Sequence, residues 1–120
     1  MTPGRRPVDG KDSMGSRILL AVLLPAVMLS TAHAADPAAG LEKAQQCQTC
    51  HGIDGVGKMP DVPNIGGESE IYLVTQLEHF RSGERQHEQM SIIAEGLTDQ
   101  DIADIAAWYS SIQFSVTLPQ

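Results

Sequence analysis

Residues 47–51 read Cys47-Gln48-Thr49-Cys50-His51, the pattern C-x-x-C-H. Two cysteines three positions apart, followed at once by a histidine, are typical of the attachment site for a c-type haem. Each thiol can form a thioether with one of the two vinyl groups on a single porphyrin edge, and the imidazole of His51 can then ligate the iron. The sequence therefore predicts one haem c, bound covalently through Cys47 and Cys50.

A C-x-x-C pair has two other common uses, zinc binding and thiol redox chemistry. A structural zinc site needs further ligands from a second cluster, and the chain has only two cysteines. A thioredoxin-like pair is expected beside a βαβ pattern, and no such pattern is visible in the sequence. Haem attachment is the interpretation that the rest of the chain favours.

A secretory signal peptide is expected near the N-terminus. Residues 18–29, ILLAVLLPAVML, form an apolar run that a basic residue precedes, and Ala32-His33-Ala34 follows as an A-x-A cleavage pattern. A transmembrane helix needs about 20 apolar residues, which is more than this run supplies. A retained N-terminal anchor is the alternative.

Cleavage after Ala34 would divide the chain into two parts. Residues 1–34 would be an N-terminal extension and signal peptide that is removed, and translation could start at Met1 or Met14. Residues 35–120 would be a monohaem domain that functions in the periplasm without a membrane span. A domain of this size has a marginal hydrophobic core, and a haem would add apolar bulk to it.

The expected mature chain is strongly acidic. Four basic and thirteen acidic side chains remain after residue 34, a formal charge of −9. Such a surface repels nucleic acid and anionic membranes. We therefore expect no nucleic-acid partner, and redox protein partners that carry a basic docking patch.

Helices are predicted at both ends of residues 35–120. Asp36 is a suitable N-cap and Pro37 suits the first helical position, whereas Gly40 either weakens this helix or permits the close approach of another. The last helix starts at Thr98, and its first turn is acidic, as the helix dipole favours. Its buried face is expected to contain Ile102, Ile105, Ala106, Tyr109 and Ile112.

One further helix is predicted between these two, over residues 69–81. Ser69 can cap it, and Ile71, Val74, Leu77 and Phe80 recur at a spacing of three, with Tyr72 and Leu73 beside this stripe. Glycines and prolines make residues 52–68 an irregular loop, which is expected to wrap the His51 side of the haem. Residues 84–90 are polar and expected to be irregular, and residues 91–95 to form one helical turn. No stretch alternates with the period of a strand, so the fold is expected to be all-α.

The chain resembles the class I c-type cytochromes, in particular the small bacterial monohaem members. It is similar to one half of the dihaem cytochromes c and to the cytochrome c-553-like proteins. The matching segments are C-x-x-C-H-G at 47–52, P-N-I-G-G at 63–67, Tyr72 with Leu77 and Phe80, R-S-G-E-R at 81–85, Met90, and L-T-D-Q-D-I at 97–102. The resemblance covers nearly all of residues 36–113. It implies the small class I cytochrome c fold, in which the first and last helices cross and the covalent haem lies in the core.

The resemblance also implies the iron ligands. His51 is the proximal ligand, and a proline carbonyl that accepts a hydrogen bond from its ring is assigned to Pro63, with Pro60 as the alternative. The candidates for the sixth ligand are Met59, His79, His87 and Met90. Met90 matches the family's ligand position, His87 is close enough to compete, and an open position is a third possibility. Arg81 and Arg85 could pair with a haem propionate or simply be solvated.

The expected function is single-electron transfer in the periplasm, without enzymatic activity, by one haem c with His51 and Met90 as ligands. The alternative is a cytochrome c subunit of a larger periplasmic dehydrogenase or oxidase complex. A gas-binding or catalytic haem protein would need an open sixth position, which Met90 argues against. A haem-free thiol protein is the remaining class.

Overall fold

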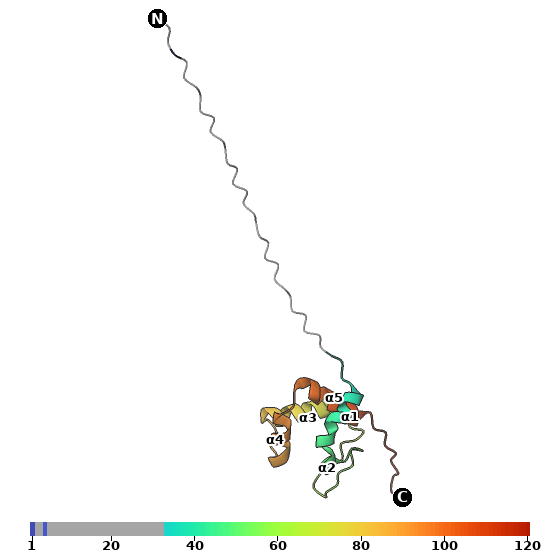
Figure 1. Ribbon diagram of the computed structural model, residues 1–120. Helices are drawn as coiled ribbons and strands as arrows, with labels where there is room; N and C mark the ends of the chain where they lie inside the picture. The colour runs from blue at the N-terminus through green and yellow to red at the C-terminus, as the bar shows by residue number, and fades with distance from the viewer. Residues whose placement is uncertain (2–3, 5–32) are drawn as a thin grey trace. The chain divides into compact units, whose positions relative to one another are not determined.

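The computed structural model describes Met1, Gly4 and residues 33–120 (Figure 1). The elements in chain order are α1 (Pro37–Lys43), the 3₁₀ turn η1 (Ala44–Gln46), α2 (Gln48–His51), α3 (Glu70–Ser82), α4 (Glu88–Glu95) and α5 (Asp99–Ser110). This described part contains helices and no strand, which confirms the all-α prediction. The apolar run at residues 18–29 lies outside it. No helix within the described residues has the length and apolar character that a membrane crossing requires.

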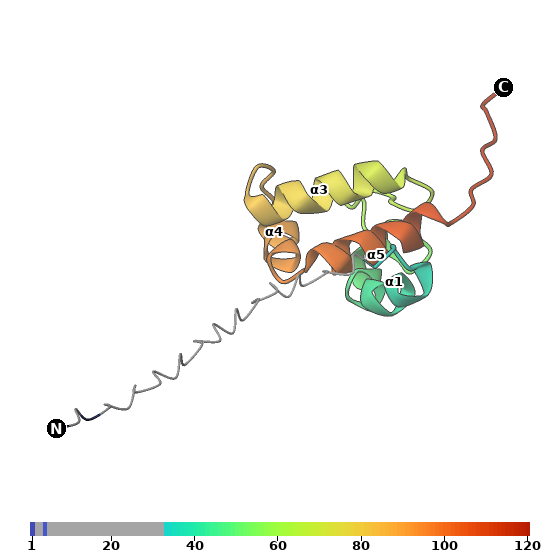
Figure 2. The ribbon, with the colours of Figure 1, turned by 90° about the horizontal axis from the view of Figure 1, so that it is seen from above.

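The first and last helices cross in direct contact, as expected. Seen from above, α5 lies between α1 and α3 and packs on both (Figure 2). Gly40 is buried at the crossing, where an added Cβ would lie 1.9 Å from the carbonyl oxygen of Asp104. The glycine is therefore present because α5 leaves no room for a side chain on this face of α1.

A charged network joins the same two helices. The Lys43 ammonium pairs with Asp101 and, at 3.3 Å, with Asp104. Asp104 is only 3 % exposed and accepts hydrogen bonds from the backbone N–H of Asp36 at 2.9 Å and from Gln100 at 2.8 Å. Burial opposes the ionisation of Asp104, but these hydrogen bonds and Lys43 keep its pKa below the ordinary value. The network thus ties the segment before α1 to α5.

The α3 helix lies within one residue of its predicted bounds, and Ser69 caps it by accepting from the N–H of Tyr72 at 3.2 Å. The apolar stripe at a spacing of three does not coincide with the buried face, because Ile71 is 81 % exposed whereas Leu73 and Phe80 are buried. A spacing of three falls 60° short of a full turn at each step. Ile71 is thus half a turn away from Phe80, and the buried face follows Leu73, Leu77 and Phe80 instead.

The α4 helix corrects a second expectation. Residues 88–90 were expected to be irregular, but the helix begins at Glu88 and contains Met90 in its first turn. His87 is the N-cap, and its ring accepts hydrogen bonds from the first turn. Histidine is not among the residues that commonly cap helices, which is why the sequence pattern did not reveal this start.

The core forms around α5. Its buried members are Ala44, Leu73, Leu97, Ile102, Ile105, Ala106 and Tyr109. The predicted face of α5 is confirmed at Ile102, Ile105, Ala106 and Tyr109, whereas Ile112 lies beyond the helix end and is only half-buried. Thr98 caps α5 through a reciprocal pair of hydrogen bonds with Asp101.

Candidate haem-binding site

A single cleft of about 700 Å³ brings together the five residues predicted for the site, which are Cys47, Cys50, His51, Pro63 and Met90. They come from the η1–α2 segment, from the loop after α2 and from α4. Most of the remaining wall is apolar and includes Leu73, Leu77, Phe80, Ile93 and Ile105. A largely apolar cleft of this size, with a few convergent polar groups, is typical of a cofactor site.

The C-x-x-C-H motif lies on a short helical turn. The N–H groups of Cys50 and His51 both donate to the carbonyl oxygen of Cys47, at 3.2 and 2.9 Å. Residues three and four positions apart lie on the same side of a helix. The two thiols and the imidazole are therefore presented to the cleft together, and α2 ends at once at Gly52.

The two cysteines are free, and Cys47 is poorly suited to redox chemistry. Burial, the largest cause, and the neighbouring Cys50 together raise the pKa of the Cys47 thiol to about 11, although a hydrogen bond with Tyr109 opposes the shift. A reactive thiol is favoured by a lowered pKa, because the thiolate is the nucleophile. The environment of Cys47 therefore argues against a thiol redox pair.

Zinc binding also lacks support in this part of the chain. Among the described residues, no group of three or more His, Cys, Asp or Glu side chains is arranged to hold a metal ion. A structural zinc site requires four such ligands. The donor set of the cleft, two thiols and one imidazole beside apolar walls, instead fits a covalently attached haem.

The imidazole of His51 is 9 % exposed, and its Nδ1 lies 3.0 Å from the carbonyl oxygen of Pro63. Because a carbonyl can only accept, Nδ1 donates and carries the hydrogen. The lone pair on Nε2 then remains available to a metal, and the hydrogen bond orients the ring. This contact is with Pro63 and not with Pro60.

Three of the four candidates for the sixth ligand line the cleft, namely Met59, His87 and Met90. His79 does not, and its ring pairs with Glu84 at 3.3 Å. Met59 is 44 % exposed, whereas Met90 is half-buried. The cleft thus contains one candidate from the loop after α2 and two from the start of α4.

The two arginines have different surroundings. Arg81 donates to the carbonyl oxygen of Leu97 at 3.0 Å and to Asp99 at 2.6 Å, so it links α3 to the start of α5. Arg85 lines the cleft, with its guanidinium carbon 4.6 Å from the centre of the Phe80 ring. Of the two, only Arg85 is placed to meet an anionic group in the cleft.

The sequence did not reveal that Ile93 lines the cleft or that the Tyr109 hydroxyl bonds to the end of α2. Ile93 lines the cleft one turn after Met90 on α4, and the spacing of three between them was a usable signal. Tyr109 is 1 % exposed, and its hydroxyl donates to the carbonyl oxygen of Gly52 at 3.0 Å. Burial raises the pKa of Tyr109, so the hydroxyl stays protonated and holds the end of α2 against α5.

The family model described as "Cytochrome c" matches residues 35–113. Cytochrome c4 from Pseudomonas aeruginosa is 40% identical over 102 residues, which cover 84% of this chain and 51% of that protein. Cytochrome c-554(548) from Halomonas halodenitrificans is 47% identical over 81 residues, which cover 65% of this chain and 98% of that protein. The chain therefore spans about half the length of the first relative and nearly all of the second.

Solved structures show the same relationship. The reduced recombinant cytochrome c4 from Pseudomonas stutzeri matches with a TM-score of 0.64 and 37% identity, covering 69% of this chain and 48% of that one. The thiosulfate dehydrogenase TsdBA from Marichromatium purpuratum matches with a TM-score of 0.61 and 36% identity, covering 64% of this chain and 19% of that one. Together with the cleft and its motif, these findings show that the chain belongs to the cytochrome c family, with the class I fold and a binding site for haem c.

Proposed function

We propose that this protein is a periplasmic single-electron carrier in which His51 and Met90 ligate the iron of one haem c. The observation that carries the proposal is the single cleft that holds Cys47, Cys50, His51 and Met90. When bound, haem c supplies a one-electron iron couple. The chain supplies its attachment, its ligands and its apolar surroundings.

The ligand pair determines which chemistry the protein favours. The hydrogen bond from His51 to Pro63 orients the imidazole and raises its basicity as a ligand. The Met90 thioether is a weak donor that favours ferrous iron and therefore raises the potential relative to two histidines. With both His51 and Met90 as ligands, no position would be open to a substrate, so transfer to and from partner proteins is the expected activity.

A partner with a basic docking patch suits the charge of the chain. Residues 35–120 carry a formal charge of −9, and the cleft lining includes Asp61 and Glu68. Arg85 is the one Lys or Arg among the residues that line the cleft in the described part of the chain. Opposite charge accelerates encounter, and the acceleration falls as salt screens the charges.

The alternative is an electron-transfer subunit of a larger periplasmic complex. Its support is the similarity to TsdBA, a thiosulfate dehydrogenase of which this chain covers 19%. The same domain could serve either role, because the cleft and its ligands would be identical. Co-purification of a dehydrogenase with the protein from its native cells would favour the subunit, and recovery of the protein alone would favour the carrier.

Removal of the Met90 side chain tests the ligand assignment. Met90→Ala should abolish the weak sulfur-to-ferric-iron absorption near the red end of the spectrum, lower the midpoint potential, and allow the reduced protein to bind carbon monoxide. Met59→Ala is the matched control, because it removes the other cleft methionine and should retain the band. The opposite result, with the band lost in Met59→Ala and kept in Met90→Ala, would assign the ligand to Met59.

A further inference from the structure

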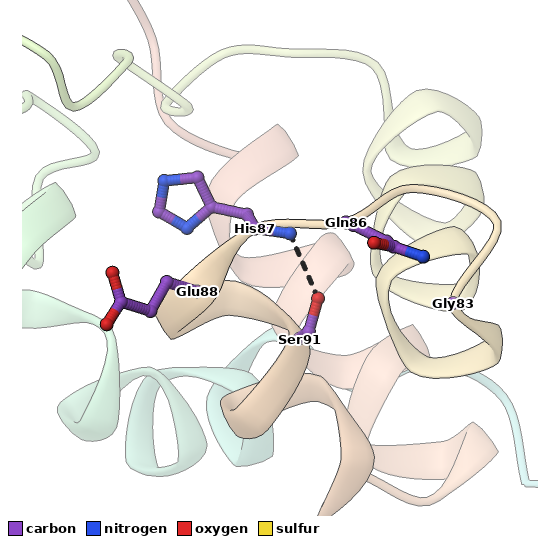
Figure 3. Close-up of a pocket in the computed structure, with 5 residues that line it drawn as sticks. All are labelled: Gly83, Gln86, His87, Glu88 and Ser91. Atoms are coloured by element: carbon purple, nitrogen blue, oxygen red, sulfur yellow. Dashed lines mark hydrogen bonds between the residues drawn. The ribbon is translucent and has the colours of Figure 1, made fainter.

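The first turn of α4 is closed by a histidine ring. Nδ1 of His87 accepts hydrogen bonds from the backbone N–H groups of Gln89 and Met90, both at 3.3 Å. In return, the backbone N–H of His87 donates to Oγ of Ser91 at 3.1 Å, as the dashed line in Figure 3 shows. Met90 therefore lies inside a turn that is bonded at both ends.

The position of Met90 makes this cap important. The first N–H groups of a helix have no carbonyl partner within the helix, and Met90 is the third residue of α4. The partner of its N–H is the His87 ring. Loss of that acceptor would loosen the turn that holds the Met90 backbone in place.

The His87 ring is itself anchored to α3. It meets the Phe80 ring edge to face, with 6.4 Å between the ring centres and 74° between the ring planes. Phe80 is 8 % exposed and lines the cleft. The cap thus rests on a buried side chain of the neighbouring helix.

The same contacts restrict His87 as a ligand, although it lines the cleft. Nδ1 uses its lone pair to accept the two N–H groups, so the imidazole hydrogen is on Nε2. In this arrangement neither ring nitrogen presents a free lone pair. A histidine that ligated iron would have to give up the cap first.

We propose that His87 is a positioning residue that keeps Met90 at the iron and withholds its own imidazole from it. The proposal rests on the proposed ligation by Met90. His87 acts through the first turn of α4, and its loss should raise the fraction of time that the Met90 sulfur is away from the iron.

The test compares His87→Ala with His87→Asn in the holoprotein produced from the full chain. Asparagine is a strong N-cap and restores the acceptor without an imidazole. In His87→Ala, the rate of carbon monoxide binding to the reduced protein should rise about fivefold, which corresponds to about 1 kcal/mol for a lost cap. In His87→Asn, the rate should remain within about twofold of the parent rate, and the sulfur band should be unchanged.

Met90→Ala is measured alongside to separate the two proposals. If Met90→Ala keeps the sulfur band, ligation by Met90 is wrong and both proposals fall. If Met90→Ala loses the band while His87→Ala binds carbon monoxide at the parent rate, only the role of His87 is overturned. If His87→Asn binds carbon monoxide as fast as His87→Ala does, the imidazole itself is required, and the capping role is again overturned.

Discussion

The crossing of α1 and α5 makes Gly40→Ala a sensitive test of the fold. An added Cβ would lie 1.9 Å from the carbonyl oxygen and 2.7 Å from the carbonyl carbon of Asp104, and 2.9 Å from Cβ of Trp108. Two of these three atoms belong to the backbone, so rotation of a side chain cannot relieve the overlap. The two helices would have to move apart.

The expected loss of stability can be worked out from two opposing effects. Overpacking a core typically lowers the stability of the fold by about 1–3 kcal/mol, and an overlap with backbone atoms is expected to cost an amount at the upper end of this range. Alanine in place of glycine within a helix stabilises the helix by about 1 kcal/mol. The net loss is therefore about 2 kcal/mol, which corresponds to roughly 8–16 °C in Tm for a domain of this size.

Two other glycines provide matched controls in the same thermal or urea unfolding assay. Gly96 has an ordinary backbone conformation, and the nearest atom to an added Cβ is the carbonyl oxygen of Ile93 at 3.8 Å. Gly96→Ala should be neutral or stabilising by up to about 1 kcal/mol. Gly83 has open space around it but a φ of +80°, so Gly83→Ala should lose roughly 1 kcal/mol through backbone strain alone.

The order of the three variants decides the result. Gly40→Ala should be the least stable, and covalent haem should remain on the chain because the thioethers do not depend on the crossing. A Gly40→Ala protein as stable as Gly96→Ala would refute the close approach of the two helices. Equal losses in Gly40→Ala and Gly83→Ala would mean that the crowding at Asp104 is relieved more easily than its backbone contacts suggest.

Three further predictions concern attachment, processing and pH. Cys47→Ala combined with Cys50→Ala should leave no haem stain on a denaturing gel, and retained stain would contradict thioether attachment. N-terminal sequencing of the exported protein should begin at or near Ala35, whereas an intact leader in the membrane fraction would indicate an anchor. The hydrogen bond from Lys43 and those from Thr98 lower the pKa of Asp101 to about 2. This pKa lies below the value of about 3.9 in an unfolded chain. The stability that the ionised Asp101 provides is therefore present above about pH 4 and is lost as the pH falls towards 2. Asp101→Asn should therefore lose roughly 1 kcal/mol at pH 7, and its urea midpoint should fall less steeply than that of the parent between pH 4 and 2.

Much of the local structure was predictable because its causes are local. The N-caps Asp36, Ser69 and Thr98 each accept a hydrogen bond within the first helical turn, so the residues that start each helix are adjacent in sequence. The C-x-x-C-H motif is equally local, since one helical turn carries both thiols and the imidazole. The haem prediction needed no long-range contact.

Two features required tertiary structure. The spacing of three put Ile71 and Phe80 in one apolar stripe of α3, but the contacts with α5 and the cleft select the face of Leu73 and Phe80. Pro60 and Pro63 were both candidates until the loop brought the Pro63 carbonyl to 3.0 Å from His51. Both outcomes depend on how distant segments pack, and the order of residues does not encode this directly.

The start of α4 shows most clearly the difference between what the sequence determines and what tertiary structure decides. Residues 84–90 are polar and contain no common capping residue before Met90, so the sequence by itself determined only that a methionine follows α3 at this distance. The helix forms there because the His87 ring rests on Phe80 of α3 and accepts two backbone N–H groups. A histidine cap supported by a residue of another helix is a tertiary contact, and only the folded chain reveals that it holds Met90 in the first turn.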